Sequence, residues 1–349
     1  MSGGKIRFGW IFALLIGIAA ISALYVVGGG SGMLNYVLNP PEKLTLSTIL
    51  FIAFVLGILH GATPDEHTWP ITFSYAVGSY STRKGMKAGF AFSLGFTAQR
   101  ALLTTLGFLG LAAIYKTYNL DGPVYILVGV AMAIAGAYIL NKRKYIHLPF
   151  DLLFRGSEHH TEQASRLQPH EEVELRHVSL RMAIVHGLIA GFGFGAYATI
   201  IVFILAPRVP GLIYAPLPGL FFGLGTMVMQ IVFGALFSNL ARLKGMSEKD
   251  VAHVGRKTAG RTLYYGGMLF AIIGLVIVFF PEINSFAIST GNHIPNLDSI
   301  GVATLLVLAV VGVFGIGNLI LGIREILRNG GTRSGGGKKA SAGLDSERA

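Results

Sequence analysis

Apolar stretches about twenty residues long recur along this chain, and they restrict its fold more than any other feature. A helix needs about 20 apolar residues to cross a bilayer, and only helices or closed barrels satisfy their backbone groups in lipid. Of the 349 residues, 52% are hydrophobic and 13% are charged. The pattern predicts an all-α, polytopic membrane protein with about eight transmembrane helices. These helices are expected at Phe8–Val27, Leu46–Thr63, Met86–Ile114, Val124–Leu140, Met182–Leu205, Leu212–Leu240, Leu263–Phe280 and Ile300–Ile323.

Lysine and arginine alternate between two sets of loops. One set holds most of them, beginning with Lys5, Arg7 and Arg83, while the segment from Pro281 to Ser299 holds none. Cytoplasmic loops are enriched in basic residues. We therefore expect a multi-pass protein in the lipid bilayer of the cytoplasmic membrane, with both termini in the cytoplasm. The net charge of +11 reflects this topology rather than nucleic-acid binding, and the absence of cysteine excludes disulfides and thiolate metal sites.

Two parts of the chain resemble each other. Three matches occur in the same order, which predicts two three-helix repeats, residues 44–140 and residues 181–281. Because three is odd, the copies must cross the membrane in opposite directions, an arrangement typical of transporters that hold substrate between inverted repeats. The alternative is that helices rich in glycine and phenylalanine resemble one another through composition. The matches are Gly89 to Gly95 with Gly219 to Gly225, His60-Gly61 with His186-Gly187, and Gly129 to Gly136 with Gly267 to Gly274.

Three further segments complete the domain organisation. Residues 141–180 form a cytoplasmic loop that is rich in histidine and glutamate. Such a loop either collects or senses metal, or is a solvated linker. A final helix over residues 300–323 completes one transporter domain, residues 1–325. The Gly/Ser/Lys-rich residues 329–349 predict a disordered cytoplasmic tail.

The second apolar stretch runs into a cluster of ionisable side chains. His60, Asp65, Glu66 and His67 follow an uncharged run, and Pro64 lies among them. Ionisable groups at membrane depth are costly and indicate function, and a proline break is one way to build an ion site there. Imidazole and carboxylate suit nickel, cobalt, zinc or iron. We interpret the cluster as a metal site, against the alternative of a polar cluster that only joins two helix halves.

Three other polar residues lie inside apolar stretches. Arg100 is expected to pair with Asp65 or Glu66 as a counter-ion, or else to bind an anionic substrate. Gln99 is its polar neighbour. His186 precedes the glycines of Gly191 to Gly195, which either unwind a helix beside the site or allow close helix packing. His186 itself is either a metal ligand or a buried histidine bonded to a carbonyl.

The spacing of this cluster resembles the nickel/cobalt transporter family and its urease-accessory and metal-exporter relatives, whose second span carries H-x4-D-H. Phe92 to Gly95 (FSLG) is similar to the start of the family's third-span motif, F-S-L-G-H-S. Here Glu66 separates Asp65 from His67, and Phe96 stands where the family has histidine. The resemblance implies that His60, Asp65 and His67 contact the metal, with Glu66 as a further candidate ligand.

Together these observations predict a secondary transporter that moves a divalent transition metal ion, with nickel and cobalt as the leading candidates. The ion is the cargo, so we expect no resident cofactor, and a cytoplasmic metal donor or acceptor would be a partner. Neither an H-E-x-x-H helix nor a Walker phosphate loop is present, so an enzyme is not expected. Two alternatives stay open: an exporter of a small anion, sulfite or an organic acid, centred on Arg100, and an intramembrane metal-dependent enzyme that uses the same cluster.

Overall fold

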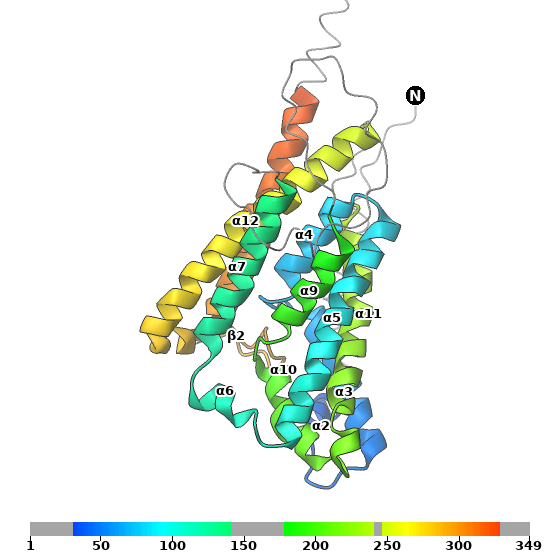
Figure 1. Ribbon diagram of the computed structural model, residues 1–349, viewed down its shortest axis with the longest axis vertical. Coiled ribbons are helices and arrows are strands. Elements are labelled where there is room, and N and C mark those ends of the chain that lie inside the picture. Colours follow the sequence, from blue (N-terminus) through cyan, green and yellow to red (C-terminus); the bar gives the residue numbers. More distant parts are fainter. Residues whose placement is uncertain (1–30, 141–177, 241–245, 329–349) are drawn as a thin grey trace, which may run out of the picture.

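The computed structural model describes residues 31–140, 178–240 and 246–328, and the chain in these ranges is mostly helical. This confirms the all-α expectation, with one two-stranded hairpin added (Figure 1). The expected helix Phe8–Val27, nearly all of the 141–180 loop and the 329–349 tail lie outside these ranges. The helices are α2 (Ser31–Leu38), α3 (Leu46–Ala62), α4 (Trp69–Ser79), α5 (Thr82–Phe108), α6 (Ala113–Thr117), α7 (Asp121–Ile139), α9 (Leu180–Ala190), α10 (Ala196–Thr199), α11 (Leu217–Phe237), α12 (Glu248–Phe279) and α13 (Val302–Val307).

Shorter elements connect or extend these helices. A π-helical segment, Ile200–Leu205, continues α10, and a second, Leu308–Gly317, continues α13 into a helix that reaches residue 328. The strands β1 (Ala287–Ser289) and β2 (Ser299–Gly301) pair antiparallel, with Ile288 opposite Ile300. The remaining elements are the 3₁₀ turns Ala206–Arg208, Leu212–Tyr214 and Pro281–Ser285.

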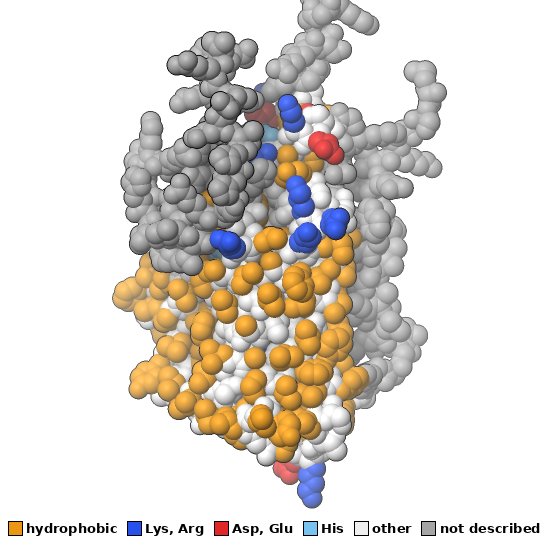
Figure 2. All heavy atoms as spheres, turned by 45° about the vertical axis from the view of Figure 1, so that its right-hand side comes forward, with side chains coloured by type: hydrophobic (Ala, Val, Ile, Leu, Met, Phe, Trp, Pro, Cys, Tyr) orange, Lys and Arg blue, Asp and Glu red, His pale blue; other side chains and the backbone are white. Residues whose placement is uncertain are grey.

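Four helices within the described ranges are long and apolar enough to cross a membrane: Asp121–Ile139, Leu212–Phe237, Glu248–Phe279 and Val302–Arg328. Three shorter helices are also apolar, Leu46–Ala62, Leu180–Ala190 and Ala196–Arg208. Hydrophobic side chains form a broad band over the face drawn in Figure 2, and lysine and arginine gather above this band. These features are compatible with a transmembrane protein.

Helix α12 begins well before the expected Leu263. The Ser247 hydroxyl accepts a bond from the Asp250 amide (3.2 Å), and the Asp250 carboxylate accepts one from the Ser247 amide (3.3 Å). This reciprocal cap starts the helix in a polar stretch that hydropathy alone does not mark. The helix therefore has 32 residues and packs along α7, forming a tilted pair beside the group that contains α3, α5, α9 and α11 (Figure 1).

Glycines bring the helices close enough for backbones to touch. At Gly57 in α3, an added Cβ would lie 2.0 Å from the Phe222 carbonyl oxygen in α11, and at Gly187 in α9 it would lie 1.8 Å from the Phe92 carbonyl oxygen in α5. No other side chain fits without separating these helices. Gly122, Gly129 and Gly136 of α7 similarly face Gly274, Gly267 and Gly260 of α12 or their immediate neighbours.

These glycine contacts come in matched pairs whose residue numbers differ by 130. They give α3 against α11 the same relation that α9 has against α5. In this register Gly57 corresponds to Gly187, so His60 corresponds to Ala190 and not to His186. The sequence match of the two His-Gly pairs stays a prediction, and it differs from the offset of these contacts by four residues, about one helical turn. The pairs are Gly57 on Phe222 with Gly187 on Phe92, Gly225 on Phe54 with Gly95 on Ile184, and Gly61 on Met229 with Gly191 on Gln99.

Candidate metal centre

The chain leaves the helical conformation between Ala62, where α3 ends, and Trp69, where α4 begins. Pro64 has no amide hydrogen and disfavours helix in the residue before it. The Thr63 hydroxyl donates to the Leu59 carbonyl (2.9 Å), which satisfies one of the last carbonyls of α3. The break that Pro64 predicts is thus present, and it places Asp65, Glu66 and His67 between two half-helices, with His60 in the last turn of α3.

Asp65 holds the turn that precedes the second half-helix. Its Oδ1 accepts bonds from the backbone amides of His67 (3.1 Å) and Thr68 (2.9 Å). These two amides lie just before α4 begins at Trp69, and a carboxylate that accepts the amides two and three residues on is a common way to fix such a turn. The same carboxylate turns its Oδ2 towards His60, whose Nδ1 lies 3.7 Å away. Asp65 therefore links the end of α3 to the start of α4.

Asp65, Glu66 and His67 form a compact group. Each offers one ligand atom, and these atoms all lie within 4.8 Å of one another. The Nδ1 atom of His67 lies 3.1 Å from Glu66 Oε1, which also accepts a bond from the Tyr125 hydroxyl of α7 (3.1 Å). Imidazole and carboxylate oxygens at this spacing are a donor set that divalent transition metals accept.

Both histidines of the break are buried among aromatic rings. His60 stacks on Phe96 and Phe222, with ring centroids 5.5 and 5.2 Å apart, and His67 meets Tyr125 edge-on at 5.0 Å. The Nε2 atom of each ring is buried without a hydrogen-bond partner among the described residues. Because a buried polar atom without a partner is costly, these nitrogens fit a site that is completed by an ion.

A second break faces the first. Helix α9 ends at Ala190, and α10 begins at Ala196 after the glycines of Gly191 to Gly195. An added Cβ at Gly193 would lie 2.6 Å from His67 Nδ1, so only glycine fits beside this ring. The expectation that these glycines unwind the helix beside the site agrees with the structure. The alternating glycines mark this stretch in the sequence, but nothing in the sequence indicates that Gly193 contacts His67.

Arg100 does not form the expected ion pair with Asp65 or Glu66. Its guanidinium donates to the Gly193 carbonyl (2.8 Å) and lies 4.7 Å from the centre of the Phe96 ring. No carboxylate in the described ranges lies within 4.0 Å of it. The unwound backbone and the aromatic faces hold the charge instead. Asp65 and Arg100 still attract each other electrostatically over a longer distance.

His186 and Gln99 lie outside the compact group. His186 Nδ1 lies 2.7 Å from the Tyr75 hydroxyl and 3.1 Å from the Met182 carbonyl oxygen, so it joins α9 to α4. This is the arrangement of a buried histidine bonded to a carbonyl, outside the Asp65 group; its Nε2, like those of His60 and His67, is buried without a partner among the described residues. The Gln99 amide is buried against Gly191, and neither its nitrogen nor its oxygen has a partner among the described residues.

Tyr125 and Tyr197 were not anticipated from the sequence. Tyr125 bonds to Glu66, and Tyr197 lies edge-on to His60 at 5.7 Å. Both lie in apolar stretches where tyrosine resembles any other aromatic residue, and only the fold reveals their contacts.

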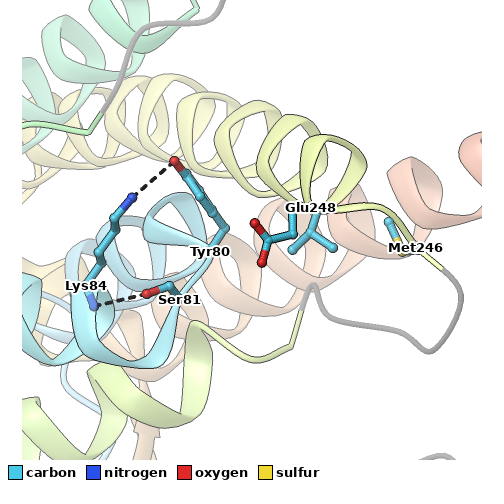
Figure 3. A pocket seen from close by; sticks show the side chains of 6 residues that line it. Tyr80, Ser81, Lys84, Met246 and Glu248 are labelled. Carbon is cyan, nitrogen blue, oxygen red and sulfur yellow. Dashed lines mark hydrogen bonds between the residues drawn. The ribbon is translucent and has the colours of Figure 1, made fainter.

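A surface pocket lies elsewhere, between the first turns of α5 and α12. Lys84 donates to the Tyr80 hydroxyl there (3.3 Å), and Glu248 lies on the opposite wall (Figure 3). The full length of α4 separates this pocket from the break at Asp65.

Comparisons of the chain with protein-family models, with curated proteins and with solved structures found no match.

Proposed function

We propose that this protein is a secondary transporter that moves a divalent transition metal ion across the cytoplasmic membrane, with nickel and cobalt as the leading candidates for the cargo. The observation that carries the proposal is the group of buried Asp65 and His67 and half-buried Glu66, with ligand atoms within 4.8 Å of one another. His60, 3.7 Å from Asp65, extends the group. Borderline divalent cations favour this mixture of imidazole and carboxylate. The resemblance of these residues to the nickel/cobalt transporter signature supports the same cargo.

The architecture that we propose with this function has about eight spans and two inverted repeats, residues 44–140 and 181–281. The glycine contacts with a constant offset of 130 residues support the repeat. Both half-helix pairs, α3 with α4 and α9 with α10, are interrupted, and the interruptions meet where Gly193 touches His67. Discontinuous helices that meet at a buried site are a recurring way to bind an ion between two repeats.

Uptake into vesicles tests the proposal. We expect proteoliposomes with the purified protein to accumulate radioactive nickel or cobalt, and His60→Ala or His67→Ala to lower the initial rate by about 10- to 100-fold. The matched control is His253→Ala, because His253 is exposed on α12. Uptake by protein-free vesicles is subtracted as background. A His67→Ala rate equal to the wild-type rate after this subtraction would contradict a role for the cluster.

A specific observation also favours a second candidate, an exporter of a small anion. The Nε and Nη1 atoms of Arg100 are buried without a hydrogen-bond partner among the described residues. A buried guanidinium with open donors suits an oxyanion such as sulfite or a carboxylate. In this reading Gly193 and the aromatic rings of Phe96 and Phe222 orient the arginine towards its substrate.

Replacing Arg100 separates the two candidates. If metal is the cargo, Arg100→Gln removes a positive charge near Asp65, and we expect the Kd for Ni²⁺ to fall by a factor on the order of ten. If an anion is the cargo, the same variant abolishes its transport, while His60→Ala and His67→Ala retain it. Titration calorimetry with nickel and vesicle efflux of labelled sulfite measure the two outcomes.

A further inference from the structure

A short hairpin between α12 and α13 reaches the metal centre. It comprises the turn Pro281–Ser285, strands β1 and β2, and the loop between the strands. The Thr290 amide donates to the Asp298 carbonyl (2.9 Å), which extends the strand pairing into the loop. At the base, Asn284 donates to Asp121 at the start of α7 (2.9 Å). The hairpin thus has a fixed base, and Figure 1 shows its strand β2 near α10.

The tip of this hairpin contacts both broken helices. The side-chain amide of Asn296 donates to the Thr63 hydroxyl (3.3 Å). Thr63 is the residue that caps the end of α3 just before Pro64. The Pro295 carbonyl accepts a bond from the Tyr197 hydroxyl of α10 (3.2 Å). Ile294 beside them is 4% exposed, although most of the hairpin is open to solvent. A buried tip on an exposed hairpin indicates a specific docking contact.

The two contacts lie directly against the cluster. Thr63 is two residues from Asp65, and Tyr197 lies edge-on to His60 with ring centroids 5.7 Å apart. The tip therefore bridges α3 and α10 next to the cluster. The other two half-helices, α4 and α9, are joined by the bond between Tyr75 and His186. His60 is 4% and His67 5% exposed, so both rings are closed off from solvent.

We propose that the tip of the hairpin, Ile294, Pro295 and Asn296, is a gate that controls the access of an ion to the cluster from the side that carries the hairpin. Closing it seats Asn296 on Thr63 and Pro295 on Tyr197. Opening it breaks those two hydrogen bonds and withdraws Ile294, while the base stays anchored through Asn284. Neither bond involves a ligand of the proposed metal site, so the gate can open without displacing the ligands. This inference rests on the proposed transport function.

The absence of native cysteine makes a direct test simple. The pair Thr63→Cys and Asn296→Cys replaces side chains whose atoms lie 3.3 Å apart, and diamide or a short bifunctional thiosulfonate bridges them. We expect the bridge to lower nickel uptake by about tenfold or more, and a reductant to restore it. The control pair, Ser289→Cys and Ser299→Cys, bridges β1 to β2 without tethering the tip, so uptake should persist under oxidation.

Hydrogen–deuterium exchange of the backbone amides of residues 63–68 gives a readout that does not depend on transport. We expect slower exchange in the bridged protein and faster exchange in the single variant Asn296→Ala, which also serves if the cysteine pair fails to fold. Undiminished uptake by the bridged protein, or exchange that neither variant alters, would contradict the proposal that the tip is a gate. Altered exchange in a protein whose wild type neither binds nor takes up Ni²⁺ would support the gate and overturn the metal-transport proposal.

Discussion

Asp65 has two roles that a single carboxylate rarely combines. One oxygen accepts bonds from the amides of His67 and Thr68 and so fixes the turn before α4, while the other faces His60 across 3.7 Å. The first role needs only an acceptor, whereas the second draws on negative charge. A residue of this kind makes the geometry of the cluster depend on the helix that follows it, since moving α4 moves the carboxylate.

Two substitutions separate these roles. Asp65→Asn keeps the oxygen that accepts the two amides, while Asp65→Ala removes it, and both remove the charge. We expect Asp65→Ala to be less stable than Asp65→Asn by about 1 kcal/mol, the usual net contribution of a hydrogen bond. We expect both variants to lose high-affinity nickel binding. Thermal unfolding in detergent and calorimetric titration measure the two effects, and equal stability of the two variants would show that the bonds from Asp65 to the two amides contribute nothing.

The residues of the centre were partly predictable from the sequence. His60, Asp65, Glu66 and His67 lie within eight positions of one another and stand out because ionisable groups are rare beside apolar runs. The partner of Arg100 was not predictable, because a backbone carbonyl such as that of Gly193 carries no mark in the sequence. His186 resembled a candidate ligand by residue type, yet its Nδ1 lies against the Tyr75 hydroxyl, a contact that the sequence does not mark.

Among the elements, the two interrupted helices define where the site lies. Pro64 explains the first interruption, and five residues that alternate glycine with phenylalanine explain the second. Around them the helices pack through glycine, so that backbone touches backbone between α3 and α11 and between α9 and α5. Rigid packing on these faces would confine movement to the interruptions and to the hairpin.

Adding one methyl group to these faces tests the packing. Gly57→Ala and Gly187→Ala each place a Cβ within 2.0 Å of a carbonyl oxygen on the facing helix. Because the backbone oxygen cannot rotate away, we expect a loss of about 1–3 kcal/mol in the free energy of unfolding for each. Gly312→Ala is the control, since nothing lies within 4 Å of its added Cβ. Unfolding midpoints indistinguishable from that control would contradict the close packing.

Element boundaries followed the sequence where hydropathy alone marks the helix, as in α7, and departed where a cap or a glycine run overrides it. The cap at Ser247 starts α12 sixteen residues before the apolar run, and the glycines divide the expected span Met182–Leu205. The hairpin was not predicted, because strands of three residues leave too short an alternating pattern to recognise.

At the scale of the whole molecule, the distribution of side chains suits a bilayer. Figure 2 shows an apolar band beneath a group of lysines and arginines, and the hairpin segment from Pro281 to Ser299 contains neither. In the topology that we propose, basic residues lie on the cytoplasmic side, so α4 and α9 would point inwards and the hairpin outwards. An ion would then reach Asp65, Glu66 and His67 from outside past the hairpin and from inside past the Tyr75–His186 bond.

X-ray absorption at the nickel edge tests most directly whether the cluster holds a metal ion. The purified protein is loaded with one equivalent of Ni²⁺, and its spectrum is compared with that of the His67→Ala variant. We predict imidazole scattering together with carboxylate oxygen in the wild type, and a weaker imidazole contribution in the variant. A wild-type spectrum of water oxygens alone, or one that His67→Ala leaves unchanged, would contradict the claim that Asp65, Glu66 and His67 bind the transported ion.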